Sequence, residues 1–265
     1  MTTRREALEM IGLATGSLLL CSCAGQALSG GGGAAHPAMA ENQSPDFPWP
    51  YEKLDPEACA ERAYQGFLKG HCMYGSFYGI IGELAEKKGA PYNTFPFKMM
   101  NIGAGGGAGW ATLCGALNGS MLVFTLLDKN PDPLVDELFG WYQKEALPNY
   151  RPQKPRVEIA VTSISKSPLC HASVSRWCKA AKVKSFSLER DERCAWLTAS
   201  VTKKTVEILN ARMDNTFKSS YPLPNYVKEC RSCHDKGGMI ENTRGKMECG
   251  TCHSNADMGA EHPKI

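Results

Sequence analysis

The C-terminal tail contains two short runs of the form C-x-x-C-H, and this repeat constrains the fold more than any other feature of the chain. The first run spans residues 230–234 and the second spans residues 249–253. From residue 219 onward proline, glycine and asparagine are frequent, and no helical periodicity is visible. A segment of this composition buries too little apolar surface to fold by itself, so it needs a covalent or metal staple.

The C-x-x-C-H pattern is typical of covalent haem attachment. Its two thiols bond to the vinyl groups of the porphyrin, and the following histidine is the proximal ligand of the iron. The tail, residues 219–265, is therefore predicted to be a dihaem segment with two c-type haems. Its attachment residues are Cys230, Cys233, Cys249 and Cys252, and its proximal ligands are His234 and His253.

The same four cysteines leave other interpretations open. Their spacing also fits a four-cysteine zinc ribbon, in which ~15–20 residues separate the two pairs, and two disulfides are a third alternative. A histidine after each pair favours haem, because only 6 of the 265 residues are histidine. A zinc-stapled interaction protein is the function that the zinc alternative would imply.

Each haem iron has a second axial position, for which the chain offers candidates. Two histidines follow the C-x-x-C pairs and two others adjoin cysteines, which leaves His36 and His262 as candidate distal ligands. Met247 and Met258 are alternatives, and methionine would raise the reduction potential relative to histidine. An open position at one iron would instead indicate a multihaem reductase.

The N-terminal residues, 1–27, have the pattern of a signal peptide. Arg4 and Arg5 precede an apolar run at residues 11–20, and small residues follow it. A charged start, a short apolar middle and a small-residue end are typical of export signals, and the run is shorter than the ~20 residues of a membrane span. The paired arginines favour the twin-arginine route to the periplasm, and a lipid anchor at Cys23 is the only membrane contact that we consider.

The remaining chain divides into an arm and a helical domain. Residues 28–46 are rich in glycine and alanine and are expected to form a flexible arm. Residues 47–218 contain most of the apolar periodicity, so the predicted fold class is mainly α, a helical cysteine-containing domain followed by the irregular haem segment. The 30 basic and 27 acidic residues are too balanced to indicate nucleic acid as a partner.

Apolar residues recur at three- and four-residue steps along this domain. The first helix is expected to begin after Asp55, a good N-cap, and to end at Gly89. A glycine-rich stretch at 103–109 satisfies a nucleotide-binding fingerprint, but no strand precedes it, so we expect it to allow close helix packing near Cys114. The pattern predicts helices at 55–89, 110–127, 131–147, 168–183 and 187–213, and a short strand at 156–164.

Four motifs, together with the paired C-x-x-C-H runs, resemble the split-Soret cytochrome c family. More broadly, they resemble the redox-active proteins named for the pattern C…GCAxxG…C…C. One departure is Leu113, which stands where the family has glycine before the central cysteine. The motifs are FPWP at 47–50, CGALNG at 114–119, SPLC at 167–170 and WC at 177–178.

The resemblance implies a homodimer with four haems in contact at one end, each iron held by two histidines. It also implies an iron–sulfur site of 2Fe–2S type in each subunit at the other end. Four thiolates are what such a cluster requires. Carried over by position, the ligands would be Cys72, Cys114, Cys170 and Cys178.

The cysteine positions add one constraint on the local structure. On a straight helix Cys170 and Cys178 would lie ~12 Å apart, too far for one small cluster, so the segment is expected to bend between them. Cys59 and Cys194 lie on apolar helical faces and are predicted to be core thiols. No acid–base pair or nucleophile stands out, so we expect an exported dihaem electron carrier that works with redox partner proteins rather than an enzyme.

Overall fold

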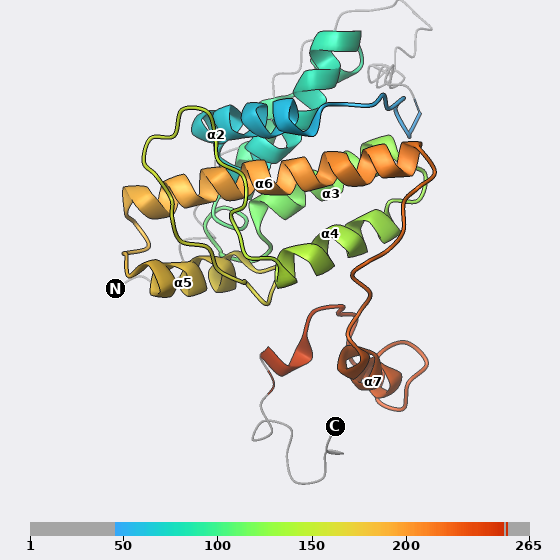
Figure 1. Ribbon diagram of the computed structural model, residues 1–265. Coiled ribbons are helices and arrows are strands. Elements are labelled where there is room, and N and C mark those ends of the chain that lie inside the picture. The colour runs from blue at the N-terminus through green and yellow to red at the C-terminus, as the bar shows by residue number, and fades with distance from the viewer. Residues whose placement is uncertain (1–45, 252, 254–265) are drawn as a thin grey trace, which may run out of the picture. The chain divides into compact units, whose positions relative to one another are not determined.

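The computed structural model describes residues 46–251 and residue 253, and Figure 1 shows their arrangement. They belong to one compact unit that begins at Ser44. The fold is mainly α, as predicted. The helices are α2 (Pro56–Lys88), α3 (Gly115–Leu127), α4 (Asp132–Lys144), α5 (Cys170–Ala181), α6 (Leu188–Met213) and α7 (Asn225–His234), with short 3-10 helices at Tyr92–Thr94, Phe97–Gly103 and Cys249–Thr251.

Several sequence predictions fall outside the described residues. They concern the signal peptide, nearly all of the glycine-rich arm, one haem-attachment cysteine and the candidate distal ligands. The residues in question are 1–45, Cys252, Met258 and His262, with His36 inside the first range. None of the described helices combines the length and the apolar character needed to cross a membrane.

Helix α2 is two helices folded back on each other, so the expectation of one helix from residue 55 to residue 89 is wrong. Its ends agree with the prediction, but Gly70–His71 leaves helical geometry, with φ of −153° and 66°. The two halves approach closely because glycines face one another, and a Cβ on Gly66 would lie 3.0 Å from the Cα of Gly75. Across the same contact Arg62 pairs with Glu83 at 3.0 Å.

Helix α6 packs against α2, α3 and α4 and forms the centre of the domain (Figure 1). Ser187 caps it by accepting a hydrogen bond from the N–H of Arg190 at 3.2 Å. Burying one large apolar side chain contributes about 1.5–3 kcal/mol, so the core supplies most of the stability. The core includes Phe77, Ile80, Phe124, Leu138, Trp141 and Ile208.

Three further predictions differ from the structure. The strand expected at 156–164 is not formed, and within this described segment only Ser163 takes part in an isolated bridge, with Leu147. Helix α3 begins at Gly115 rather than at residue 110, because Ala108 and Ala111 adopt positive φ and cannot continue a helix. The tail, expected to lack helical structure, contains α7.

Candidate metal centres

Two of the predicted cluster cysteines are brought together by paired loops. The N–H of Cys114 donates to the carbonyl of Pro168 at 2.9 Å, and the N–H of Cys170 donates to the carbonyl of Thr112 at 2.6 Å. The leucines immediately before the two cysteines form an antiparallel bridge. Cys114 is the N-cap of α3, and Cys170 is the first residue of α5, so these contacts bring the starts of the two helices together.

A third cysteine, Cys72, reaches the same region because α2 breaks just before it. Its Sγ lies 3.8 Å from the carbonyl oxygen of Gly103, at the start of the glycine-rich loop. Gly115 makes this approach possible, since a Cβ there would collide with the Cys72 sulfur. Gly115 lies outside the glycine-rich stretch at 103–109, but within that stretch a Cβ on Gly106 would lie 2.8 Å from the Cβ of Cys170.

Each of these three cysteines lies at the N-terminal end of a helical segment. Cys72 begins the second half of α2, Cys114 caps α3, and Cys170 opens α5. The partial positive charge at a helix N-terminus favours a thiolate over a thiol. The arrangement therefore suits ligands that must be deprotonated to hold a metal.

Burial opposes deprotonation in the protein without a bound metal. It raises the pKa of Cys72 and Cys114, and it raises that of Cys170 to about 12. Neighbouring thiols add to the increase at Cys72 and Cys170. A bound metal would supply the positive charge that stabilises the thiolates.

A fourth thiol, that of Cys194, belongs to the same group. Burial is the main reason for the raised pKa values of Cys72, Cys114 and Cys170, and Cys194 adds to each of them. Cys194 and Cys72 also pack against the same hydrophobic cluster, built around Tyr64. Cys194 is only partly buried, whereas Cys59 is fully buried as a core thiol.

The bend expected between Cys170 and Cys178 is not present. Helix α5 runs from Cys170 to Ala181 without a break, so eight residues of rise separate the two Cα atoms by ~12 Å. Burial raises the pKa of Cys178, with a smaller contribution from Cys194. Cys178 thus interacts with Cys194 at the edge of the thiol group.

The spacing of the thiols bears on which metal group fits. Among the described residues, no three side chains of His, Cys, Asp or Glu converge as ligands of one metal ion. A two-iron cluster spreads its four thiolates over two irons and so needs a wider set. The buried thiol of Cys114 and the partly buried thiols of Cys72, Cys170 and Cys194 would supply the four thiolates that a two-iron cluster requires.

The first C-x-x-C-H run lies on α7, which ends at His234. The Nδ1 atom of His234 is 2.8 Å from Oδ1 of Asn242. The chain after α7 folds back, and the N–H of Thr243 donates to the carbonyl of His234 at 2.9 Å. With Nδ1 as the donor to Asn242, Nε2 carries the lone pair, which is the usual arrangement of a metal-bound histidine.

The two runs approach each other at their first cysteines. Burial raises the pKa of Cys230, and the thiol of Cys249 adds to the increase through charge and hydrogen bonding. Next to them, burial and a hydrogen bond with Glu248 raise the pKa of Tyr226 to about 12. His253 is exposed.

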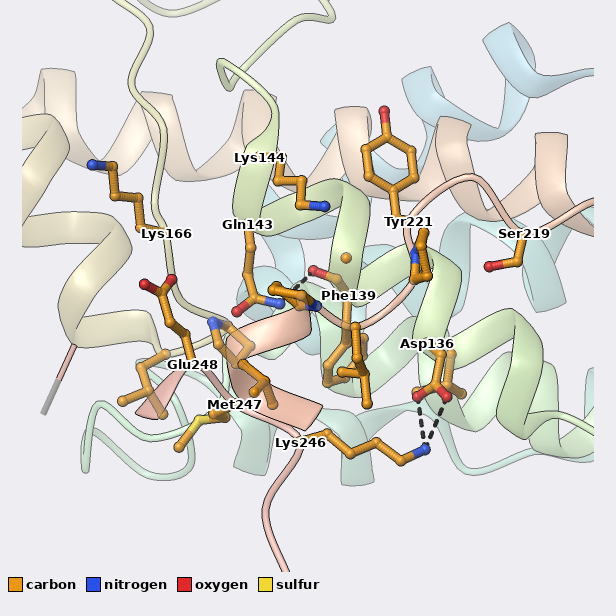
Figure 2. Close-up of a pocket in the computed structure, with 18 of the residues that line it drawn as sticks. Asp136, Phe139, Gln143, Lys144, Lys166, Ser219, Tyr221, Lys246, Met247 and Glu248 are labelled. Carbon is orange, nitrogen blue, oxygen red and sulfur yellow. Dashed lines mark hydrogen bonds and ion pairs between the residues drawn. The ribbon is translucent and has the colours of Figure 1, made fainter. Parts of the chain in front are cut away.

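A cavity of about 740 Å³ lies between α4 and the tail (Figure 2). One wall contains Leu113 and Leu169, the neighbours of Cys114 and Cys170, and another contains Tyr226 and Val227 of α7. In Figure 2 Lys246 reaches across to Asp136 of α4, at 2.9 Å. Apolar and aromatic side chains make up most of the remaining lining, and three lysines also border it. The apolar and aromatic residues include Val135, Phe139, Tyr221, Leu223 and Met247, and the lysines are Lys144, Lys166 and Lys246.

The helical fold and the buried group of thiols define the class of protein. Residues 76–208 match the model of the redox-active protein family C_GCAxxG_C_C. The chain belongs to this family and, within it, to the split-Soret cytochromes c. It is 43% identical over 219 residues to split-Soret cytochrome c of Desulfovibrio desulfuricans, and the match covers 78% of each chain.

The fold is similar to a solved structure of the split-Soret cytochrome c from Desulfovibrio desulfuricans, which is described as having a novel iron centre. The similarity has a TM-score of 0.73 at 42% identity and covers 81% of this chain and 95% of that chain. Both the mainly helical fold and the family resemblance expected from the sequence are therefore confirmed.

Proposed function

We propose that the chain is an exported electron-transfer protein with two covalently attached haems and one 2Fe–2S cluster. The observation that carries this proposal is the meeting of Cys72, Cys114 and Cys170, from three separate segments, beside a cavity bordered by the C-x-x-C-H tail. The similarity to a cytochrome c described with an iron centre supports both groups. The signal-like residues 1–27 support export to the periplasm.

In this proposal the cluster is held by Cys72, Cys114, Cys170 and one further cysteine. Family position assigns Cys178 to the fourth place. The unbroken α5, and the effect of Cys194 on the pKa of each of the other three thiols, favour Cys194 instead. A bound 2Fe–2S cluster accepts and releases one electron, and the surrounding helices exclude water and hold the thiolates in place.

The haems would be attached at Cys230, Cys233, Cys249 and Cys252, with His234 and His253 as proximal ligands. Tyr226 and Val227, just before the first C-x-x-C-H run, and residues 246–248, just before the second, border the cavity, and its lysines would suit haem propionates. Asn242 would fix the orientation of His234. We propose His36 and His262 as the distal ligands of the two haem irons.

Electron transfer also requires surfaces for other proteins, and a homodimer and external redox partners remain part of the proposal. Met99, Ile102 and Trp110 are 63%, 64% and 83% exposed. They flank the loop whose Gly103 contacts the Cys72 thiol. Clustered exposed apolar side chains are typical of protein interaction sites, so a partner bound here would lie close to the cluster.

Metal and acid-labile sulfide analysis of the holoprotein, with its visible spectrum, tests this function. We expect four irons and two sulfides for each chain, and a c-type spectrum that survives acid–acetone extraction. Two irons without sulfide would remove the cluster from the proposal. A double variant, Cys230→Ala with Cys233→Ala, should lose one haem and keep the sulfide.

Two alternatives remain, and the same preparation separates them. The contact between the Cys230 and Cys249 thiols would also suit a zinc ribbon, and a colourless protein that contains zinc would establish it. A multihaem reductase predicts an open iron position, so carbon monoxide binding to the reduced protein would favour that function over an electron carrier.

A further inference from the structure

Arg193 is a buried cation without a carboxylate partner among the described residues. It is 1% exposed, and its Nη2 donates to the hydroxyl of Ser173 at 2.9 Å. Its Nε and Nη1 atoms have no hydrogen-bond partner. The neighbouring carboxylate, Glu192, is already used, since it accepts from Tyr64 at 2.8 Å and pairs with Arg156 at 2.6 Å.

Such an arrangement is unfavourable unless an anion lies nearby. A buried charge left without a counter-ion strongly destabilises a folded chain, because burial removes its water and nothing replaces it. The ring of Trp177, 5.8 Å from the guanidinium carbon, gives only weak compensation. Arg193 therefore indicates an anionic group within reach of its two unpartnered nitrogens.

The groups around Arg193 show where this anion would lie. Burial raises the pKa of Cys170, and the Arg193 charge partly opposes the increase, which places the guanidinium near that thiol. Tyr142 is fully buried, and its hydroxyl makes no hydrogen bond of normal geometry. Burial raises the pKa of Tyr142. The Cys114 thiol adds to this increase and the Arg193 charge opposes it, so the Tyr142 hydroxyl lies near both groups.

We propose that Arg193 and Tyr142 donate hydrogen bonds to sulfur atoms of the iron–sulfur cluster, and that Arg193 raises its reduction potential. The inference rests on the proposed function, because it needs the cluster. A 2Fe–2S cluster with four thiolates is an anion, and uptake of one electron makes it more negative by one charge. A fixed positive charge nearby therefore favours the reduced form.

The test is the midpoint potential of the cluster in the holoprotein, measured by redox titration with detection of the reduced cluster by electron paramagnetic resonance. At a fixed applied potential, Arg193→Met should shift the ratio of oxidised to reduced cluster at least tenfold toward oxidised, which is about 59 mV for a one-electron couple. Tyr142→Phe should shift it less, in the same direction. Arg193→Lys, which keeps the charge, should lie between Arg193→Met and the wild type.

The matched control is Arg212→Met, which removes the same charge from the same helix. It lies 19 positions from Arg193, about 28 Å along α6, and it pairs with Asp128 instead. We expect no change of potential in this variant. An equal shift in both arginine variants would overturn the inference, because it would reflect net charge alone.

Stability distinguishes a partner of the cluster from a purely structural arginine. In protein that keeps its haems but lacks the cluster, Arg193→Met should not lower the unfolding temperature, since it removes an uncompensated buried charge. In holoprotein it should lower it. Equal destabilisation of both forms would overturn the inference. If Arg193→Met does not fold, Tyr142→Phe and Arg193→Lys decide by the same potentials.

The outcomes separate this inference from the function on which it rests. A wild-type protein without acid-labile sulfide refutes the cluster itself. A wild-type cluster with unchanged potential in all three variants refutes only the role of Arg193 and Tyr142. A folded Arg193→Met chain that loses the cluster, when Arg193→Lys keeps it, supports that role.

Discussion

The buried carboxylate of Glu137 accepts a hydrogen bond from the backbone N–H of Tyr221 at 3.1 Å. The same oxygen accepts from the N–H of Ser220 at 2.7 Å and from the hydroxyl of Ser219 at 3.3 Å. Beside these contacts, a Cβ on Gly140 would lie 2.6 Å from the Cβ of Tyr221. One side chain and one glycine of α4 thus fix the point where the tail leaves the helical domain.

Replacing this carboxylate should release the tail. Glu137→Leu leaves two backbone N–H groups and a hydroxyl without an acceptor, so we expect the free energy of unfolding to fall by about 1–3 kcal/mol. Limited proteolysis should cut faster between residues 214 and 224. Glu137→Gln is the control, since its amide oxygen can still accept. Identical proteolysis of the wild type and Glu137→Leu would contradict this account.

The fourth cluster ligand can be identified with two conservative variants. Cys194→Ser should remove most of the acid-labile sulfide and the cluster absorption, because serine replaces the thiolate that we propose as the fourth ligand. Cys178→Ser should keep both, since Cys178 lies ~12 Å from Cys170 along an unbroken helix. Iron and sulfide analysis of purified protein measures the effect. The opposite result would restore the ligand set that family position implies.

Asn242 offers a test of the haem at the first C-x-x-C-H run. Its side-chain oxygen lies 2.8 Å from Nδ1 of His234, and such a contact makes the imidazole a stronger donor to iron. Asn242→Leu should therefore raise the reduction potential of one haem. Spectroelectrochemical titration of the holoprotein should show one haem shifted and the other unchanged. Asn215→Leu, outside the tail, is the control, and equal potentials in both variants would argue against the contact.

The sequence predicted the ends of the helices better than their paths. Apolar periodicity continues through the break in α2, because each half has its own apolar face. Tyr64 and Phe67 of the first half pack in one cluster, and Phe77 and Ile80 of the second half pack in another. A periodic pattern alone cannot distinguish such a hairpin from one long helix. On one continuous helix glycines 66 and 75 would lie nine residues, or about 14 Å, apart, so a reading as one helix hides their contact.

The candidate haem residues could be proposed from local spacing alone, whereas residues that distant segments bring together could not. The C-x-x-C-H runs stand out because all their residues are adjacent in sequence. Cys194 and Arg193 carry no such signal, since their meeting with Cys72 and Cys170 depends on how α5 and α6 pack. A charged residue in an amphipathic helix is usually solvated, so only the observed burial of Arg193 reveals its unusual position.

Alkaline pH gives a further prediction through Cys59, which is fully buried in α2 and is not a proposed ligand. Burial, with a smaller effect of Glu83, raises the pKa of its thiol from 9.0 to about 12. Above pH 9 the unfolded chain loses a proton that the folded chain keeps, so this group makes folding less favourable as pH rises. Its contribution to the free energy of unfolding should be fully present below pH 9 and should fall by about 1.4 kcal/mol per pH unit up to about pH 12.

Cys59→Ala lacks this proton, so its stability should decline less steeply than that of the wild type in urea unfolding at pH 7, 9 and 10.5. Parallel declines in the two proteins would show that Cys59 ionises as readily in the folded chain as in the unfolded one.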